Sequence, residues 1–444
     1  MSIFKAYDIR GTFPDQINKE LAYKIGRAFV TFLGVKNVVV GKDCRESSDE
    51  IEEALMQGIL DEGADVVSIG LCTTPMVYFT VAKFSYDSGI MITASHNPKE
   101  YNGLKLVREA AIPISGETGI KEIESLVIKN KFYDSEIKGE IKQISNIVDE
   151  YVLNELSYGN AKELKKFRIA IDYGNGMGSL LSKKFFSHLK GEFLALYDTL
   201  DGTFPNHEAN PLKEETLDDV KEKIKASKAD LGIAFDGDAD RLFFLDEKAN
   251  VISCDKINAL IAKRLLKEHP GEKILYDLRS SKIVKEVVEK NGGIPQMCRV
   301  GHAFIKAQMR QENALFAAEL SGHFYLRDNY FFESPFYVIL KVLEVLSEEN
   351  KPLSEIIKPL NKYYASGEIN SSVKDKDAKM KELADLHKDA KEIFWLDGVS
   401  VIYDKWWFNV RGSNTEPLLR LNLEANTKAM MVKKRDEILM IIRR

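Results

Sequence analysis

The sequence predicts an α/β protein: three tandem, related α/β domains and a smaller C-terminal α+β domain around a central cleft. Short apolar runs rich in β-branched residues alternate with longer segments of helical periodicity, which is typical of βαβ units. Pairs of predicted strands also recur along the chain at uneven intervals. In each pair, a strand that ends in aspartate precedes a strand whose carboxyl end is crowded with polar residues. The length of the chain agrees with a protein of several domains, because 444 residues are too many for one hydrophobic core and suggest roughly three domains.

The first predicted domain, residues 1–145, contains a helix and three strands. The strands are residues 37–43, 64–70 and 89–95. Between the first two strands, Ile51, Leu55 and Ile59 recur at helical spacing after a Ser/Asp start. The third strand leads into "TASHNPKEYNGLK", residues 93–105. Such a polar stretch is either a turn that ends a strand or part of an active site.

The second and third predicted domains are residues 146–250 and 251–360. They repeat the pattern of predicted strands that end in polar residues. Their predicted strands, each with the polar residues that end it, are 167–178, 230–241, 273–281 and 314–323. Because open α/β sheets bind ligands at the carboxyl ends of their strands, we expect one loop from each domain to meet in one cleft. In the last predicted domain, residues 361–444, the mixed charges of 373–393 are typical of a solvated helix, and strands and a turn follow in 398–425.

Composition excludes several classes of protein. The net charge is −5, from 63 basic and 68 acidic residues without a long block of one sign, so there is no electrostatic footprint for nucleic acid or an anionic membrane. No run of about 18 apolar residues occurs, and we expect neither a secretory signal nor a membrane span. The four cysteines lack zinc-type or CxxC spacing, which favours reduced thiols in a cytoplasmic protein; they are Cys44, Cys72, Cys254 and Cys298.

The hexapeptide "DGDADR" follows the apolar run "LGIAF". Asp236, Asp238 and Asp240 alternate with small residues that let the backbone bend, so that the carboxylates can face one point. Such hard oxygen donors suit Mg²⁺. The alternative is an acidic surface turn that Arg241 neutralises, whereas a calcium loop lacks its downstream glutamate and helical flanks.

Two further polar loops could bind a phosphorylated sugar. "RGSNTEP" offers a guanidinium, hydroxyls and an amide that can wrap a phosphate, although a hydrophilic β-turn explains the same residues. "AELSGH" combines Glu319, Ser321 and His323, a set able to bind vicinal sugar hydroxyls. His302 follows Arg299 in "RVGHAFIK". A lone histidine after a strand is more often structural than catalytic, so neither histidine ranks as catalytic by itself.

In this order, "TASHNP", "DGDADR", "ELSGH" and "RGSNTEP" closely resemble the α-D-phosphohexomutase superfamily, and specifically its phosphomannomutase/phosphoglucomutase branch. The resemblance covers essentially the whole chain, since "AYDIRG", "GKDCRESS", "TTP", "YNGLK", "DGTFPNHEANP", "VGH" and "DGV" also fall in family order. It implies interconversion of hexose 1-phosphate and hexose 6-phosphate, of mannose and also of glucose, through a phosphoserine enzyme and a 1,6-bisphosphate. That bisphosphate would also act as activator.

The resemblance assigns roles loop by loop. Ser95 matches the serine that carries the phosphoryl group, and a phosphoserine oxygen would join the Mg²⁺ ligands Asp236, Asp238 and Asp240. The implied sugar loop is Glu319, Ser321 and His323; the implied phosphate clamp is Arg411, Ser413, Asn414 and Thr415. Near the reacting hydroxyl would lie Lys105, His302 and His323, of which Lys105 or His323 is the favoured general acid and base. The cleft near the phosphoserine would be lined by Tyr7, Arg10 and Arg241, and His96 would position the phosphoserine.

Some positions depart from the commonest family pattern. Ala239 stands where glycine is frequent in the metal loop, Arg299 where lysine is frequent, and no glycine precedes Glu319. These changes bear on substrate preference rather than on activity. The alternatives are a phosphoglucosamine mutase, a Mg²⁺-dependent sugar phosphatase and a silent sugar-phosphate sensor. We expect small sugar phosphates as partners, with neither nucleic acid nor membrane, and a monomer or small homo-oligomer.

Overall fold

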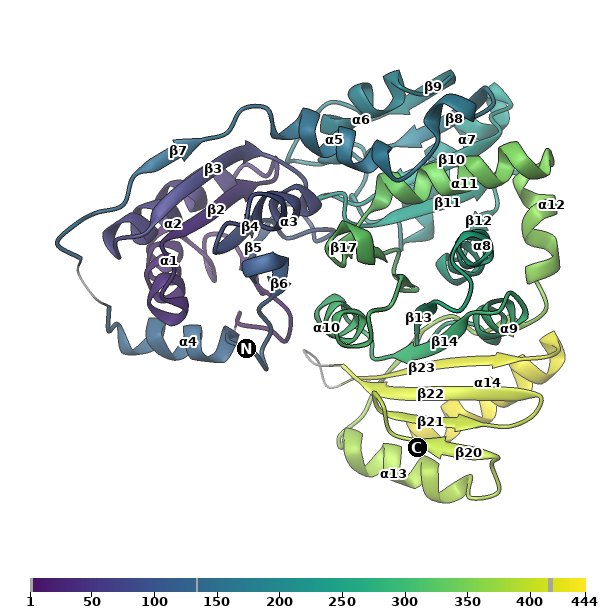
Figure 1. Ribbon diagram of the computed structural model, residues 1–444. Helices are drawn as coiled ribbons and strands as arrows, with labels where there is room; N and C mark the ends of the chain where they lie inside the picture. The colour runs from purple at the N-terminus through teal and green to yellow at the C-terminus, as the bar shows by residue number, and fades with distance from the viewer. Residues whose placement is uncertain (1–2, 133–134, 414–417) are drawn as a thin grey trace. The chain divides into compact units, whose positions relative to one another are not determined.

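The computed structural model describes residues 3–132, 135–413 and 418–444. Figure 1 shows the helices and strands of the chain. The chain divides into two compact units, each built from two stretches of sequence. The first unit comprises Met1–Cys254 and Ser321–Ser354; the second comprises Asp255–Leu320 and Glu355–Arg444. Residues 321–354, which the predicted third domain includes, therefore belong to the first unit.

The first sheet of the first unit has the order β1-β5-β4-β2-β3-β7, with β6 paired to β5. Strands β2, β3, β4 and β7 are parallel, and β1, β5 and β6 are added antiparallel. The strands are β1 (Ile9–Thr12), β2 (Asn37–Lys42), β3 (Asp65–Leu71), β4 (Ser88–Ile92), β5 (Tyr101–Arg108), β6 (Ile112–Pro113) and β7 (Ile141–Gln143). The helices are α1 (Lys19–Leu33), α2 (Ser48–Asp61), α3 (Thr74–Lys83) and α4 (Ile120–Lys129).

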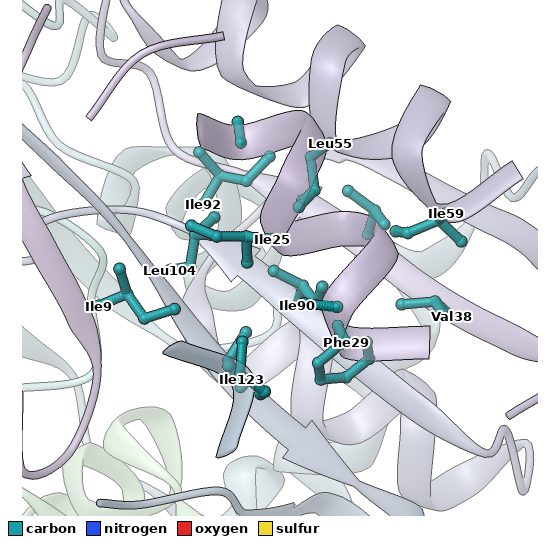
Figure 2. Packing of buried hydrophobic residues seen from close by; sticks show 14 of the residues in the cluster. Ile9, Ile25, Phe29, Val38, Leu55, Ile59, Ile90, Ile92, Leu104 and Ile123 are labelled. Carbon is teal, nitrogen blue, oxygen red and sulfur yellow. The ribbon is translucent and has the colours of Figure 1, made fainter. Parts of the chain in front are cut away.

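The core beside this sheet explains why α2 forms where the periodicity predicts it. Ile51, Leu55 and Ile59 are fully buried. They pack in one cluster with α1 residues such as Phe29 and with the strand residue Ile90 (Figure 2). Burying side chains of this size stabilises the fold by about 1.5–3 kcal/mol each. The apolar stripe thus fixes α2 on the sheet and leaves the strand ends for polar loops.

The second sheet of the first unit has the order β12-β11-β10-β8-β9. Strands β8, β9 and β10 are parallel, and β11 and β12 are antiparallel. The strands are β8 (Phe167–Asp172), β9 (Gly191–Leu196), β10 (Leu231–Phe235), β11 (Leu242–Asp246) and β12 (Val251–Ile252); the helices are α5 (Ile147–Ser157), α6 (Gly178–Ser187) and α7 (Asp218–Ser227).

Residues 321–354 join the first unit through an aromatic contact. They form the antiparallel pair β16 (Phe324–Leu326) and β17 (Phe332–Glu333), then α11 (Pro335–Glu349). The ring of Phe336 on α11 lies 4.7 Å from that of Phe185 and 5.5 Å from that of Phe235. Helix α11 is consequently part of the core beside the second sheet.

The second unit contains a parallel sheet and an antiparallel sheet. Its parallel strands are β13 (Lys273–Asp277), β14 (Ile294–Cys298) and β15 (Phe316–Ala318), with α8 (Cys254–Glu268), α9 (Lys282–Lys290) and α10 (His302–Glu312). The antiparallel strands are β18 (Tyr364–Ala365), β19 (Ile369–Ser372), β20 (Glu392–Phe394), β21 (Val399–Ile402), β22 (Trp406–Gly412) and β23 (Leu418–Ala425), with α13 (Lys376–Leu386) and α14 (Lys428–Arg443). Helix α12 (Leu353–Ile357) runs across the boundary between the units in sequence.

The predicted fold class is confirmed, because three α/β segments precede a smaller antiparallel α+β segment. Short 3₁₀ turns complete the chain at Glu109–Ala111, Ala161–Glu163, Glu214–Leu217, Arg327–Asn329 and Lys358–Leu360. Among the described residues, no helix is long and apolar enough to cross a lipid bilayer.

Candidate active site

Ser95 lies in the buried turn after β4, at the carboxyl end of a central strand. Its φ of 53° places it in the left-handed region, where residues other than glycine are strained, and its amide donates to Thr93 Oγ1 at 2.8 Å. The Ser95 hydroxyl donates to Asp236 Oδ2 at 2.9 Å and lies 3.1 Å from His96 Nδ1. The strained turn therefore directs the hydroxyl at the acidic triplet.

The triplet Asp236, Asp238 and Asp240 follows β10, and all three side chains are buried. One oxygen from each carboxylate lies within 4.8 Å of the others. Gly237 permits the close approach of the two loops, since a Cβ there would stand 2.5 Å from the Ser95 carbonyl oxygen. Ala239 adopts φ 55°, so the bend is kept at the cost of some backbone strain.

The donor set of the triplet fits a divalent cation. Burial, followed by the charges of Asp238 and Asp240, raises the pKa of Asp236 well above its usual range. Within the described part of the chain, the buried Oδ1 atom of Asp238 accepts no hydrogen bond. An excess of buried negative charge and an unused hard oxygen are features that a bound cation such as Mg²⁺ satisfies.

Lys105 on β5 bridges two of these carboxylates. Its Nζ donates to Asp238 Oδ2 at 2.6 Å and to Asp240 Oδ2 at 2.5 Å. Burial alone would lower the pKa of Lys105, but the charges of Asp238 and Asp240 outweigh it and raise that pKa. Lys105 is consequently held as an ammonium ion that can stabilise negative charge. The Thr74 hydroxyl donates to the same Asp238 Oδ2 at 2.5 Å, a contact that the sequence reasoning missed.

His323 is the histidine of the "ELSGH" loop that enters this site. Arg241 Nε donates to His323 Nε2 at 3.0 Å, while His323 Nδ1 lies 3.6 Å from Asp240 Oδ1 and 3.9 Å from Glu333 Oε1. This arrangement places the Nδ1 proton toward the two carboxylates. The sequence alone does not indicate Glu333, because only the fold brings β17 to the histidine.

Two cationic side chains and His96 complete the surroundings of Ser95. Arg10 Nη1 donates to Asn97 Oδ1 at 2.7 Å, in the same loop as Ser95. Burial, then the charges of Arg241 and Arg10, lowers the pKa of His96 well below its usual range. His96 is therefore a neutral neighbour of the Ser95 hydroxyl, in keeping with a positioning role. Tyr7 lies half-buried in the same N-terminal segment as Arg10.

The second unit brings together Glu319 and Arg411 through residues that the sequence analysis missed. Arg279 follows β13 and pairs with Glu319 at 3.2 Å and with Glu368 at 3.6 Å. Arg411 on β22 donates to Glu368 Oε2 at 2.8 Å. Burial opposes ionisation of Glu368, but Arg411 and Arg279 outweigh it and lower the pKa of that carboxyl. Glu368 thereby holds two guanidinium groups beside each other.

The remaining predicted residues are those of the expected sugar and phosphate loops, together with Arg299 and His302. The carbonyl of Ser413 accepts from Lys376 Nζ at 2.7 Å, whereas Asn414 and Thr415 lie outside the described residues. Arg299 stacks on Phe304, 3.7 Å from the ring centroid, and His302 begins α10. Ser321 is half-buried in the first unit. The first unit thus holds the serine, the acidic triplet, Lys105, His323 and Ser321, and the second holds Glu319, Arg299, His302, Arg411 and Ser413.

Comparison with known proteins identifies the family of this chain. The chain matches four family descriptions, each named phosphoglucomutase/phosphomannomutase: alpha/beta/alpha domain I over residues 1–134, domain II over 149–249, domain III over 253–363, and the C-terminal domain over 368–439. The chain belongs to the phosphoglucomutase/phosphomannomutase family.

Members of the phosphoglucomutase/phosphomannomutase family match the chain from end to end. A phosphomannomutase of Methanocaldococcus jannaschii is 42% identical and is covered over 97% of its length by 99% of this chain. A phosphomannomutase of Escherichia coli is 38% identical, with 100% of this chain and 99% of that protein covered. A crystal structure of a phosphoglucomutase/phosphomannomutase family protein from Burkholderia thailandensis has a TM-score of 0.91 at 33% identity, covering 99% of this chain and 96% of that one.

Proposed function

We propose that this chain is a phosphohexomutase, an isomerase that interconverts hexose 1-phosphates and hexose 6-phosphates, with mannose and glucose phosphates as substrates. The observation that carries the proposal is the Ser95 hydroxyl, which lies in a strained buried turn and donates to Asp236 of the acidic triplet. A serine held in this way is suited to carry a phosphoryl group beside a divalent cation.

The reaction is two phosphoryl transfers. The bond between phosphorus and Ser95 Oγ breaks as the free hydroxyl of a hexose monophosphate bonds to phosphorus, which yields a 1,6-bisphosphate. The other phosphoryl group of this intermediate then returns to Ser95. Bound by the triplet, Mg²⁺ would neutralise phosphate charge and polarise the phosphoryl group. Externally added 1,6-bisphosphate would load unphosphorylated Ser95, so it acts as an activator.

Proton transfer in this reaction involves Lys105, His302 or His323. The sugar hydroxyl must lose a proton as it bonds to phosphorus, and the departing oxygen must gain one on return. Lys105 is held as a cation by Asp238 and Asp240, which suits stabilisation of negative charge. His323 is the other favoured candidate: Arg241 and Asp240 fix its ring, and its Nε2 can accept a proton once the hydrogen bond from Arg241 is released.

Substrate recognition falls to the remaining loops. Glu319 and Ser321 would bind sugar hydroxyls, and Arg411 with Ser413 would hold the phosphate that does not react. Asn414 and Thr415 would add donors to the same clamp, and Arg299 would line the substrate. The Arg279–Glu319 pair supports this view, since it orients the carboxylate by a charged hydrogen bond.

The test is Ser95→Ala, with Ser88→Ala as matched control because Ser88 is also buried and lies on β4. We expect Ser95→Ala to lower turnover of mannose 1-phosphate and glucose 1-phosphate by at least about 1,000-fold, because the carrier oxygen is lost. Ser88→Ala should keep its activity. Intact mass and peptide mapping should locate phosphate on Ser95 after treatment with glucose 1,6-bisphosphate.

The same assay distinguishes the alternatives. Release of inorganic phosphate that persists in Ser95→Ala would instead indicate a phosphatase with an aspartate nucleophile. Preferential turnover of glucosamine 1-phosphate would indicate a phosphoglucosamine mutase. Binding of hexose phosphates without turnover, at any concentration of bisphosphate, would indicate a sensor.

A further inference from the structure

Two sequence motifs have no part in the chemistry described so far. They are "GKDCRESS", residues 41–48, and "DGTFPNHEANP", residues 201–211. The first runs from the last two residues of β2 to the first residue of α2, and the second lies between β9 and α7, both in the first unit. Arg45 in the first motif is only 2% exposed, although it carries a permanent charge. Its contacts show what the two motifs do.

The Arg45 guanidinium binds the backbone of the loop that carries Ser95. Its terminal nitrogens donate to four backbone carbonyls of that loop, those of Ser95 (2.8 Å), Asn97 (2.7 Å), Pro98 (2.7 Å) and Tyr101 (3.1 Å). The remaining donor, Nε, bonds to Asp43 Oδ2 at 3.1 Å. All five N–H groups of the guanidinium are therefore used. Four carbonyls that converge on one planar cation fix the path of the loop more tightly than local turn hydrogen bonds can.

This arrangement requires the planar guanidinium group of arginine, whose N–H donors point in different directions. A lysine at this position keeps the charge but offers three donors at one point, so it cannot reach carbonyls spread across the loop. The guanidinium contacts Ser95 directly, since the Ser95 carbonyl is one of its acceptors. Ser95 has a left-handed backbone, which persists only where the surroundings impose it.

The second motif holds the guanidinium in place. The ring centroid of Phe204 lies 5.0 Å from Arg45 Cζ, a cation–π contact. Gly202 allows the chain to pack directly on Cys44 and Arg45, because a Cβ there would stand 2.2 Å from the Cys44 carbonyl oxygen and 2.5 Å from Arg45 Cα. Cys44 Sγ also contacts the Asn175 carbonyl at 3.6 Å. The loop 201–204 thus covers Arg45 from the side of the second sheet.

We propose that Arg45 is a positioning residue for phosphoryl transfer: its guanidinium fixes residues 95–101 so that the Ser95 hydroxyl faces the acidic triplet, and loop 201–204 seats the guanidinium. The kinetic part of this proposal rests on the proposed mutase function. Arg45 itself need not touch substrate, because it acts through the backbone of the Ser95 loop. A displacement of the serine by about 1 Å can cost on the order of 100-fold in rate.

The experiment compares Arg45→Lys with Arg27→Lys. Arg27 is a matched control, since it is also buried, pairs with Glu62 at 2.9 Å and stacks on Phe132, but lies on α1 outside the site. We expect Arg45→Lys to lower kcat for glucose 1-phosphate about 100-fold with KM changed less than about threefold. Phosphorylation of Ser95 by glucose 1,6-bisphosphate, followed by intact mass, should slow to a similar extent. Arg27→Lys should change neither rate.

A second variant and a second measurement keep the proposal testable if Arg45→Lys folds poorly. Gly202→Ala should lower kcat at least about tenfold without changing KM, because the added Cβ displaces the Cys44–Arg45 backbone. Amide hydrogen exchange should be faster in residues 95–101 of Gly202→Ala, and of a folded Arg45→Lys, than in the wild type, and unchanged there in Arg27→Lys.

Failure of the positioning proposal can be distinguished from failure of the proposed function. A folded Arg45→Lys with wild-type kcat and wild-type exchange in residues 95–101 would overturn the positioning role. If the wild type hydrolyses hexose phosphates instead of isomerising them, the mutase function fails, and the kcat comparison is then made on the hydrolysis. The exchange comparison is independent of which reaction the enzyme performs.

Discussion

At the scale of single residues, Lys105 compensates a buried excess of negative charge. It is 5% exposed and contacts Asp238 and Asp240. Removing one partner of a buried ion pair leaves the other charge uncompensated, which costs about 3–5 kcal/mol. We therefore expect Lys105→Met to lower the free energy of unfolding by about that amount in metal-free buffer, as measured by urea denaturation, and to abolish most mutase activity.

The control is Lys184→Met, whose partner Asp149 lies with it on the surface. Exposed pairs contribute about 0–1 kcal/mol, so this variant should unfold almost like the wild type. Saturating Mg²⁺ should recover part of the stability that Lys105→Met loses, since the ion supplies positive charge to the same carboxylates. Equal destabilisation by the two variants would contradict the compensating role of Lys105.

The limits of sequence reasoning are also clearest at this scale. Ser95 and the acidic triplet could be predicted because each lies in a contiguous polar stretch directly after an apolar strand. Thr74 and Glu368 could not, because each gains its importance from a side chain more than forty positions away in the sequence. Arg279 does carry a sequence signal, since it follows a strand that ends in aspartate, as the other polar loops do.

At the scale of elements, Glu155 on α5 serves as a cap for α11. Its Oε2 accepts from the Tyr337 amide in the first turn of α11 at 2.9 Å, and its Oε1 accepts from Asn329 Nδ2 at 2.8 Å. A free helix N-terminus needs such acceptors. Ser334, the residue that flanks the helix, makes no side-chain cap of its own. The sequence could not indicate this cap, because the carboxylate comes from another helix.

Burial raises the pKa of Glu155 to about 8, against 4.5 for an unperturbed glutamate. The folded state therefore binds a proton more tightly than the unfolded state. The stability from this group is fully present below about pH 4.5 and is lost as the pH rises to about 8. We expect Glu155→Gln to flatten the fall in unfolding free energy between pH 5 and 8, a slope of at most about 1.4 kcal/mol per pH unit. Urea denaturation at several pH values measures it.

The matched control for this slope is Glu150→Gln on the same helix, outside the cap of α11. Its pH dependence should equal that of the wild type. A slope that survives unchanged in Glu155→Gln would show that another group carries the proton.

At the scale of the whole molecule, the two units hold different groups of the proposed site. The acidic triplet and Ser95 belong to the first unit, and Arg411 with Glu368 belongs to the second. If the triplet binds Mg²⁺, the metal alone should slow amide exchange in residues 95–97 and 236–241 and leave β19 and β22 unchanged. Glucose 6-phosphate without metal should slow exchange at the ends of β19 and β22, because Arg411 on β22 would hold its phosphate.

Two variants should separate these effects. Asp238→Asn should lose the protection by Mg²⁺ and keep that by glucose 6-phosphate, because it removes a proposed metal ligand and leaves the second unit intact. Arg411→Lys should do the reverse, since a lysine cannot present two parallel donors to a phosphate. Loss of both kinds of protection in either variant would mean that the metal and the phosphate do not bind independently. That result would contradict the assignment of one ligand to each unit, and with it the division of labour that the fold of this chain implies.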